Sequence, residues 1–377
     1  MNDIRFHIDT DTPRVLALLE QQEMVLPALW LRERCQDPEH IDPDTQQRLF
    51  DPHHLPEDLS LTAAERLDSG RVRLGFSDGS RGEYDLGRLA EEFRPRDGVP
   101  AARPWDASLD RSEVTFDWRA LTGDSALHKA LGAFLGRGFL LLQHVPTDPE
   151  TILEVATRFG YVRDTNFGRH FEVYSRPGSN DLAYAAVALG PHTDNPYREP
   201  PPGIQLLHCL ANETSGGLST LTDSLAAGQA LADEDPEAFG LLATTPVRFR
   251  FVDAGEELIE RRCIIRRDAM GEMVGVYYSP RLDGLPLMAE ADVRAFHRAR
   301  QRLATLLSDA RYEMRFPLRP GELLMFDNSR VLHGRTKFDA AEGRRHLQGC
   351  YIDLDEPRSR YRTLSRRLQA AATGVET

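Results

Sequence analysis

Residues 190–203 read GPHTDNPYREPPPG, in which a histidine and a carboxylate stand two residues apart just before a proline-rich turn. With 12 His and 59 acidic residues in 377 positions, chance alone predicts about two His-x-Asp/Glu triplets. The chain contains His7-x-Asp9, His40-x-Asp42, His170-x-Glu172 and His192-x-Asp194. The pattern by itself therefore identifies no metal site, and the surrounding sequence must choose among the triplets.

The composition is that of a large globular chain with an acidic balance. Its 377 residues are 41% hydrophobic and 28% charged, which suffices for one large domain and a smaller one. The net charge of −13 argues against a nucleic-acid partner, because phosphate binding needs a basic surface. No apolar run approaches the roughly 20 residues of a membrane span, and the first residues lack the apolar segment of a signal peptide. We therefore expect a cytoplasmic protein with no membrane partner.

A proline-rich stretch near residue 100 divides the chain. Residues 1–100 contain short strand-like pieces between Pro- and Asp-rich loops, which predicts a small β-rich N-terminal domain. The sequence RPRDGVPAARPWDASLD at residues 94–110 is typical of a linker. Residues 101–377 then form a second, larger domain. The four cysteines are scattered without a C-x-x-C pair, so we expect reduced thiols rather than a disulfide framework.

The second domain is predicted to be mainly β with flanking helices. A helical pattern at residues 125–138 leads directly into an apolar strand at 139–145, and a second helix is predicted over 148–160. Strand patterns then dominate, beginning with 182–189, and the one long amphipathic helix among them covers 288–309. Many strands with turn signals at intervals of about 10 to 20 residues are typical of a jelly roll, or double-stranded β-helix.

This map favours the fourth triplet as part of a metal site. His192 and Asp194 lie between two predicted strands, and alternate residues of an extended chain project to the same side, about 7 Å apart at Cα. A two-histidine, one-carboxylate iron site needs one more imidazole and leaves three positions open. His333, directly after the strand in ELLMFDNSRVLHGRTKF, is the best candidate. His208, within an apolar strand, is interpreted as a core residue, and His346 as a weaker rival.

Four segments of the second domain resemble one enzyme family. They read HTDNPYREPPPGIQLLHCL, SGGLSTLTD, LLMFDNSRVLHGR and RRHLQGCYIDLD, in the family's order. The chain is similar to the 2-oxoglutarate-dependent dioxygenases of the taurine dioxygenase superfamily, and within it to the γ-butyrobetaine dioxygenase and trimethyllysine dioxygenase branch. LPALWLRERC also resembles the small domain that precedes the catalytic domain in this branch, so the similarity covers nearly the whole chain.

The resemblance implies an Fe(II)- and 2-oxoglutarate-dependent hydroxylase. Carried over residue by residue, it makes His192, Asp194 and His333 the iron ligands. It makes Arg345 the partner of the distal carboxylate of 2-oxoglutarate, a role for which a permanently charged, bidentate guanidinium is suited. Ser219 matches a position where the family places a hydroxyl near that carboxylate, although a threonine follows it directly. Such an enzyme uses O2 and couples C–H hydroxylation to decarboxylation of 2-oxoglutarate to succinate and CO2.

The resemblance also implies substrate residues. The positions that match or approximate an aromatic box for a trimethylammonium group are Phe167, Phe171, Tyr184 and Tyr351, with Asp181 adding a negative charge. Aromatic faces attract such a cation without hydrogen bonds, which a quaternary nitrogen cannot donate. Asn195 and Arg281 are the candidates for binding an acid at the other end of the substrate.

The implied substrate is a small trimethylammonium-bearing acid, either a γ-butyrobetaine-like carboxylate or 2-(trimethylamino)ethylphosphonate. One alternative is another small anionic substrate, such as a sulfonate. A second is a non-catalytic jelly roll that only binds a ligand. A homodimer is a further expectation.

The N-terminal domain departs from the family pattern. Many relatives hold a structural zinc there through a C-x-C-x-x-C cluster and a later histidine. This chain instead has Cys35-Gln-Asp-Pro-Glu-His40, and Ser80 stands where the later ligand would be. One thiol and one imidazole remain, whereas a tetrahedral structural zinc needs four ligands. We therefore expect no structural zinc.

Overall fold

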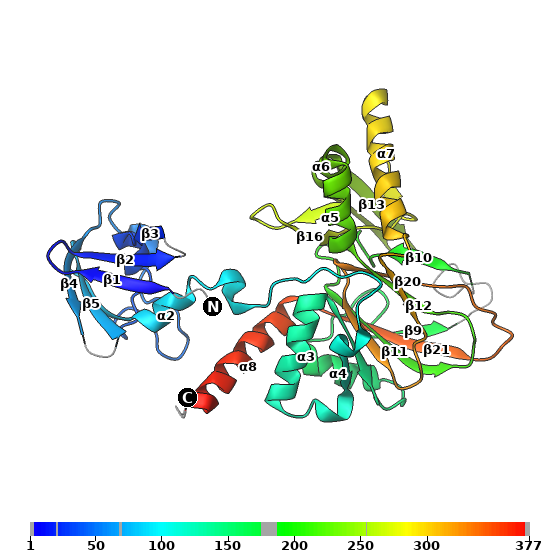
Figure 1. Cartoon of the computed structure of the whole chain (residues 1–377), viewed down its shortest axis with the longest axis horizontal. Coiled ribbons are helices and arrows are strands. Elements are labelled where there is room, and N and C mark those ends of the chain that lie inside the picture. Colours follow the sequence, from blue (N-terminus) through cyan, green and yellow to red (C-terminus); the bar gives the residue numbers. More distant parts are fainter. Residues whose placement is uncertain (1–3, 20–21, 68–69, 175–186, 254, 374–377) are drawn as a thin grey trace. The chain divides into compact units, whose positions relative to one another are not determined.

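Two three-stranded sheets come first along the chain and a jelly roll follows, with an insertion of helices and strands between two of the jelly-roll strands (Figure 1). The computed structural model describes residues 4–19, 22–67, 70–174, 187–253 and 255–373. By its contacts the chain divides into the units Met1–Val99 and Pro100–Thr377. Asp181, Tyr184 and most of the strand predicted over 182–189 lie outside the described residues. None of the described helices is both long and apolar enough to cross a membrane.

The first unit is built from two antiparallel sheets of three strands each. Its elements are β1 (Arg5–Asp9), β2 (Arg14–Leu19), β3 (Gln22–Val25), α1 (Ala28–Arg32), β4 (Leu61–Arg66), β5 (Arg71–Phe76), β6 (Arg81–Asp85) and α2 (Leu86–Glu91). The alternation of RVRLGF in β5 buries Val72, Leu74 and Phe76 and leaves the two arginines exposed. A sheet with one apolar and one polar face is the result.

The region that would correspond to the zinc site of the resembled family is held together by hydrogen bonds to β6. Cys35 is buried, which raises the pKa of its thiol. The Asp37 carboxylate accepts a hydrogen bond from the Glu83 backbone N–H at 3.2 Å. His40 Nε2 lies 3.2 Å from the Arg81 carbonyl oxygen, to which it can donate. These contacts hold the loop after α1 against β6, and the expected lack of zinc stays a prediction.

The second unit contains a jelly roll of two facing sheets. The six-stranded sheet has the order β7-β8-β19-β11-β21-β9 and the four-stranded sheet the order β10-β20-β12-β18. Their strands are β7 (Thr115–Asp117), β8 (Phe139–Gln143), β9 (Phe171–Tyr174), β10 (Leu189–His192), β11 (Ile204–Asn212), β12 (Ser219–Asp223), β18 (Glu313–Phe316), β19 (Leu323–Asp327), β20 (Val331–Arg335) and β21 (Arg345–Ile352). One buried cluster joins Phe139, Leu324 and Phe326 of the first sheet to Leu221 and Met314 of the second. The predicted jelly-roll fold with flanking helices is therefore confirmed.

Helices cover the outer face of the six-stranded sheet (Figure 1). They are α3 (Asp124–Arg137), α4 (Thr151–Phe159) and α8 (Asp355–Thr373). The first two agree with the predicted helices, and Gly138 ends α3 in the left-handed region with φ 81°. Helix α8 was not predicted, because its sequence is rich in arginine and has only a narrow apolar stripe, in which Leu364 is buried.

An insertion between β12 and β18 forms its own core. It contains α5 (Ser224–Glu234), α6 (Pro236–Thr244), β13 (Pro246–Val252), β14 (Glu257–Cys263), β15 (Ile265–Arg267), β16 (Met273–Val276), β17 (Asp283–Gly284) and α7 (Glu290–Leu307). The long helix predicted over 288–309 is α7, which buries Phe296, Ala299, Leu303 and Leu307 at helical spacing. The helices α5 and α6 were not predicted.

A buried ion pair anchors the turn that leads into β20. The Arg330 guanidinium donates to both carboxylate oxygens of Asp223 at 3.1 and 2.9 Å, and to the Gly136 carbonyl oxygen at 2.9 Å. Burial raises the pKa of Asp223, and Arg330 opposes this shift. Asp223 also accepts from the Leu225 N–H and so caps α5. Strand β20, which carries His333, therefore starts from a fixed point.

Candidate metal centre

Pairing of β10 with β20 brings two distant histidines together. His192 and His333 are register partners across these antiparallel strands, and their ring centroids lie 4.3 Å apart. Next to them, Gly334 allows close approach, because a Cβ atom there would meet the Leu189 carbonyl oxygen of β10. Residues about 140 positions apart therefore share one site only through the sheet.

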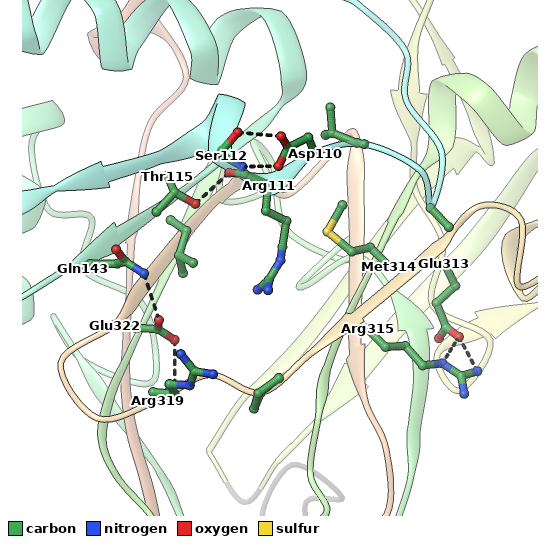
Figure 2. A pocket seen from close by; sticks show the side chains of 14 residues that line it. Asp110, Arg111, Ser112, Thr115, Gln143, Glu313, Met314, Arg315, Arg319 and Glu322 are labelled. Carbon is green, nitrogen blue, oxygen red and sulfur yellow. Dashed lines mark hydrogen bonds and ion pairs between the residues drawn. The ribbon is translucent and has the colours of Figure 1, made fainter.

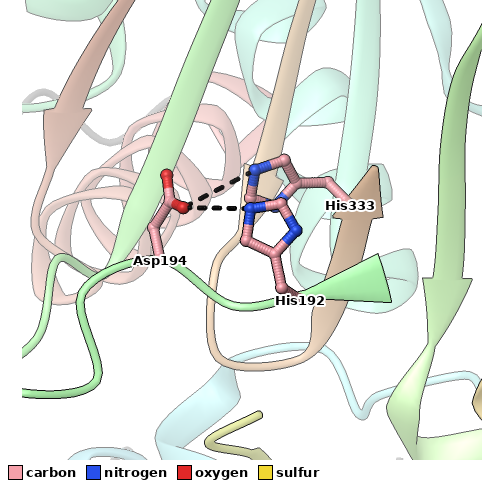
Figure 3. Close-up of side chains that lie close together, drawn as sticks. All are labelled: His192, Asp194 and His333. Atoms are coloured by element: carbon pink, nitrogen blue, oxygen red, sulfur yellow. Dashed lines mark ion pairs between the residues drawn. The ribbon is translucent and has the colours of Figure 1, made fainter. Parts of the chain in front are cut away.

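Asp194 completes a three-residue group that can hold a metal ion (Figure 3). Its Oδ1 lies 3.4 Å from His192 Nε2 and 3.8 Å from His333 Nε2. The three ligand atoms all lie within 4.8 Å of one another. Two imidazoles and one carboxylate on one side of an ion are the ligand set of non-haem Fe(II) oxygenases, which leaves the opposite positions open.

The protonation states suit coordination. His192 Nδ1 lies 3.0 Å from the Gly190 carbonyl oxygen, and donation there leaves the lone pair of Nε2 for a metal. Burial, with the neighbouring His192, lowers the pKa of His333 to about 3, so its imidazole is neutral. Burial opposes ionisation of Asp194, but His333 and His192 beside it hold the pKa of this carboxyl well below its usual range.

The loop that carries Asp194 is fixed on both sides. Asn328 accepts from the Asp194 N–H at 2.7 Å and donates to the Asp194 carbonyl oxygen at 2.9 Å. Thr193 faces the other way and exchanges hydrogen bonds with the Tyr278 backbone at 2.7 and 2.9 Å. Asn328 was not predicted as a site residue, although it stands within the segment LLMFDNSRVLHGR.

The second oxygen of Asp194 has its own partner. The Tyr351 hydroxyl donates to Asp194 Oδ2 at 2.7 Å. Tyr351 is 3% exposed, and burial together with the charge of Asp194 raises the pKa of its phenol well above the usual value. Only an aromatic role was predicted for Tyr351, because no sequence pattern connects it with Asp194.

Arg345 is a buried cation at the start of β21. It is 7% exposed, and burial lowers the pKa of its guanidinium. Its Nη2 donates a long hydrogen bond of 3.4 Å to the Gly217 carbonyl oxygen, and no ion pair among the described residues includes it. A buried charge without a counterion is costly, so this position suits an anionic ligand.

Two further residues accompany Arg345. Ser219 is buried at the start of β12, opposite Arg335 of β20 in register. Arg335 is also buried, and its guanidinium lies 5.4 Å from the ring centroid of Phe338, as does that of Arg345. The sequence analysis missed Arg335, although its spacing of two residues from His333 places both on one face of β20.

Aromatic rings adjoin the carboxylate side of the metal centre. The Phe171 ring lies 5.3 Å from that of Tyr351 and 6.2 Å from that of Phe167. Phe167 in turn lies 6.2 Å from Phe251, which stacks on Tyr197 at 4.9 Å. Three of the four aromatic residues predicted for the box are thus neighbours, and Tyr184 lies outside the described residues. Phe251 and Tyr197 were not predicted.

The two residues predicted to bind an acid have different environments. Asn195 is 7% exposed and adopts a left-handed φ of 52°. Its Oδ1 accepts from the Tyr197 hydroxyl at 2.6 Å, while its Nδ2 is buried with no hydrogen-bond partner among the described residues. Arg281 is exposed, and its charge contributes to the lowered pKa of His333, so it lies within electrostatic reach of the metal centre.

The other histidines weighed as ligands have other neighbours. His208 is fully buried and opposite Gln348 and Leu323 in register, on the helix-covered face of the sheet. His346 Nε2 lies 2.5 Å from the Glu172 carboxylate. His170 Nε2 is 3.9 Å from the same residue. None of the three joins the metal centre.

A pocket of about 650 Å³ lies by the edge strand β18 (Figure 2). Arg111, Arg315 and Arg319 line it together with Glu313 and Glu322. Its charges are partly paired, since the Glu313 and Arg315 side chains bond each other and the Glu322 carboxylate accepts from the Arg319 N–H. No member of the metal triad lines this pocket, so a large cavity alone does not locate the chemistry here.

Comparison with known proteins decides the family. Residues 99–351 match the family model described as "Taurine catabolism dioxygenase TauD, TfdA family". The chain belongs to the TauD/TfdA dioxygenase family. Residues 15–90 match the model "Gamma-butyrobetaine hydroxylase-like, N-terminal". Membership makes this chain a dioxygenase that uses Fe(II) and 2-oxoglutarate, and the His–Asp–His triad fits the iron.

Individual TauD/TfdA relatives agree with this assignment. The chain is 35% identical over 349 residues to a gamma-butyrobetaine dioxygenase of Pseudomonas sp. (strain AK-1), covering 90% of each chain. It is 30% identical over 346 residues to the mitochondrial trimethyllysine dioxygenase of Rattus norvegicus, covering 87% of this chain and 80% of that one. The fold resembles that of AAD-2, solved with Mn(II) and N-oxalylglycine, with a TM-score of 0.52 at 15% identity, covering 66% of this chain and 97% of that one.

Proposed function

We propose that this TauD/TfdA enzyme hydroxylates a small acid that carries a trimethylammonium group. The substrate is a γ-butyrobetaine-like carboxylate or 2-(trimethylamino)ethylphosphonate. One turnover inserts one oxygen atom of O2 into a C–H bond and places the other in succinate, with release of CO2 from 2-oxoglutarate. The observation that carries this proposal is the group of aromatic rings that adjoins the carboxylate ligand.

The aromatic group suits a quaternary cation. A trimethylammonium has no N–H to donate, so it gains little from amides or carbonyls, whereas the faces of aromatic rings attract it. Phe167, Phe171 and Tyr351 form a continuous set of rings at 5.3 to 6.2 Å. Because the Tyr351 hydroxyl bonds Asp194, a cation on these rings would lie on the side of the site where Asp194 stands. The adjoining carbons of the substrate would then face the reacting position.

The acidic end of the substrate needs hydrogen-bond donors or a positive charge at a distance from the aromatic rings. The buried Nδ2 of Asn195 has no hydrogen-bond partner among the described residues, and the Tyr197 hydroxyl holds its amide in one orientation. Arg281 supplies a positive charge near His333. An anion that paired with both would relieve the cost of the unpaired amide. Asp181 and Tyr184 remain proposed substrate residues.

The residues around the iron position the reactants. We assign the iron to His192, Asp194 and His333. Arg345, buried without an acidic partner among the described residues, would pair with the distal carboxylate of 2-oxoglutarate, and Ser219 would donate to the same group. When bound, the iron supplies the oxidation chemistry. The protein supplies orientation and a dry cavity.

A substrate panel tests the proposal. Succinate formation and product are measured for γ-butyrobetaine, 2-(trimethylamino)ethylphosphonate, taurine and a neutral analogue in which tert-butyl replaces trimethylammonium. We expect efficient, coupled turnover of one quaternary acid and weak turnover of the neutral analogue. Preferred turnover of taurine would refute the trimethylammonium proposal and favour the sulfonate alternative. A role in ligand binding alone is set aside, because the chain belongs to a dioxygenase family with a complete candidate triad.

A further inference from the structure

The two carboxylate oxygens of Asp194 have different surroundings. Oδ1 faces the two histidines, at 3.4 and 3.8 Å from their Nε2 atoms. Oδ2 accepts a hydrogen bond of 2.7 Å from the Tyr351 hydroxyl. A phenol is protonated at neutral pH and is therefore the donor in this pair. A metal ion between the histidines would meet Oδ1 while Oδ2 stays with the phenol.

Tyr351 is itself held firmly. It lies in β21 opposite Gln205 of the central strand β11, and its carbonyl oxygen accepts from the Arg163 N–H at 2.8 Å. Its ring packs 5.3 Å from Phe171. A buried side chain confined on the backbone and ring sides keeps its hydroxyl at one place. The carboxylate of Asp194 is thereby fixed in rotation about its Cβ–Cγ bond.

Fixing this rotation matters for the open coordination positions. A carboxylate can bind a metal through one oxygen or through both, and the second mode takes up a position that would otherwise be open. A ligand-orienting hydrogen bond also raises metal affinity, because the ligand no longer has to be ordered on binding. We propose that Tyr351 is a positioning residue for iron, whose hydroxyl holds Asp194 as a one-oxygen ligand and keeps the remaining positions free for 2-oxoglutarate and O2.

This proposal gives the ring and the hydroxyl of Tyr351 different roles. The ring of Tyr351 belongs to the proposed aromatic box, whereas the hydroxyl acts on the iron ligand. Removal of the hydroxyl alone should therefore change metal binding without changing recognition of the organic substrate. The inference holds for any substrate and does not rest on the trimethylammonium proposal.

The test compares Tyr351→Phe with a matched control. Tyr84→Phe also removes one buried hydroxyl, but that hydroxyl donates to the Leu31 carbonyl oxygen in the first unit. Metal-free full-length protein is titrated with Mn(II) alone, and free Mn(II) is followed by electron paramagnetic resonance. We expect the Kd of Tyr351→Phe for Mn(II) to rise about 10- to 100-fold. Tyr84→Phe should match the wild type.

A second measurement tests the open positions. Anaerobic protein loaded with Fe(II) is titrated with 2-oxoglutarate, and the charge-transfer absorption of the complex is recorded. In Tyr351→Phe this band should weaken or shift, because Asp194 can now bind through both oxygens. Unchanged Mn(II) affinity together with an unchanged band, in a variant that melts like the wild type, would overturn the inference. A raised KM for the organic substrate with unchanged metal binding would overturn it too, since the hydroxyl would then act on substrate.

Discussion

Replacing Phe171 by Leu should reduce the preference of the enzyme for a quaternary substrate. The Phe171 ring lies between those of Phe167 and Tyr351, so it forms the middle of the proposed box. Leucine keeps an apolar side chain but has no π-face. The loss of one cation–π contact costs about 0.5 to 2 kcal/mol depending on desolvation, which corresponds to about 2- to 30-fold in affinity. Because the Phe171 ring is half-buried and packs on the buried Tyr351, we expect the upper half of that range.

Comparing a charged substrate with a neutral one separates the effect of the cation–π contact from the effect of lost packing. The kcat/KM of Phe171→Leu is measured for γ-butyrobetaine and for its neutral tert-butyl analogue. We expect the first value to fall about 10-fold more than the second. Phe239→Leu is the control, because Phe239 is a half-buried phenylalanine of the insertion core and lies outside the ring group. Equal losses for the two substrates would mean that Phe171 is an ordinary core residue, and the trimethylammonium proposal would lose its support.

Four other predictions follow from the two units. Asp194→Ala should abolish stoichiometric Fe(II) binding while circular dichroism stays unchanged; retained iron would refute the ligand assignment. Arg345→Gln should raise the KM for 2-oxoglutarate at least about 30-fold, since a buried charge pair is lost, with little change for the organic substrate; an unchanged KM would place the cosubstrate elsewhere. Metal analysis of untagged protein should find no zinc at one per chain, because Cys35 and His40 lack the remaining ligands; a zinc that survives iron chelators would contradict this. Burial lowers the pKa of His208 to about 4, so the unfolded chain binds the extra proton first as the pH falls, and stability is lost between about pH 6.5 and 4. Between pH 7 and 4.5 the free energy of unfolding in urea should fall by up to about 2 kcal/mol less in His208→Leu than in the wild type. An identical fall in both proteins would show that His208 is not buried as a neutral imidazole.

Local sequence patterns predicted much of the fold. The helix over 288–309 appears as α7 because its apolar residues recur at helical spacing and meet one core. The helix α8 could not be predicted in this way, since its arginine-rich sequence shows little periodicity and its docking depends on neighbouring helices. The region between β12 and β18 was expected to be mostly strands, but α5 and α6 fold there against α7. In each case the local helix preference is weak, and packing against neighbouring elements determines that the segment is helical.

The sequence by itself determined the kinds of groups present and their local spacing. In an extended segment, the separation of His192 and Asp194 by one residue puts both side chains on one face, and Arg345 is a permanent cation wherever it lies. Only the tertiary structure decided which partners meet. Antiparallel pairing places His333, and not His208 or His346, beside His192. The position of Tyr351 on β21 brings its hydroxyl to Asp194 Oδ2. The physical reason is that sheet register joins residues far apart in sequence through backbone hydrogen bonds, which leave no trace in any local pattern.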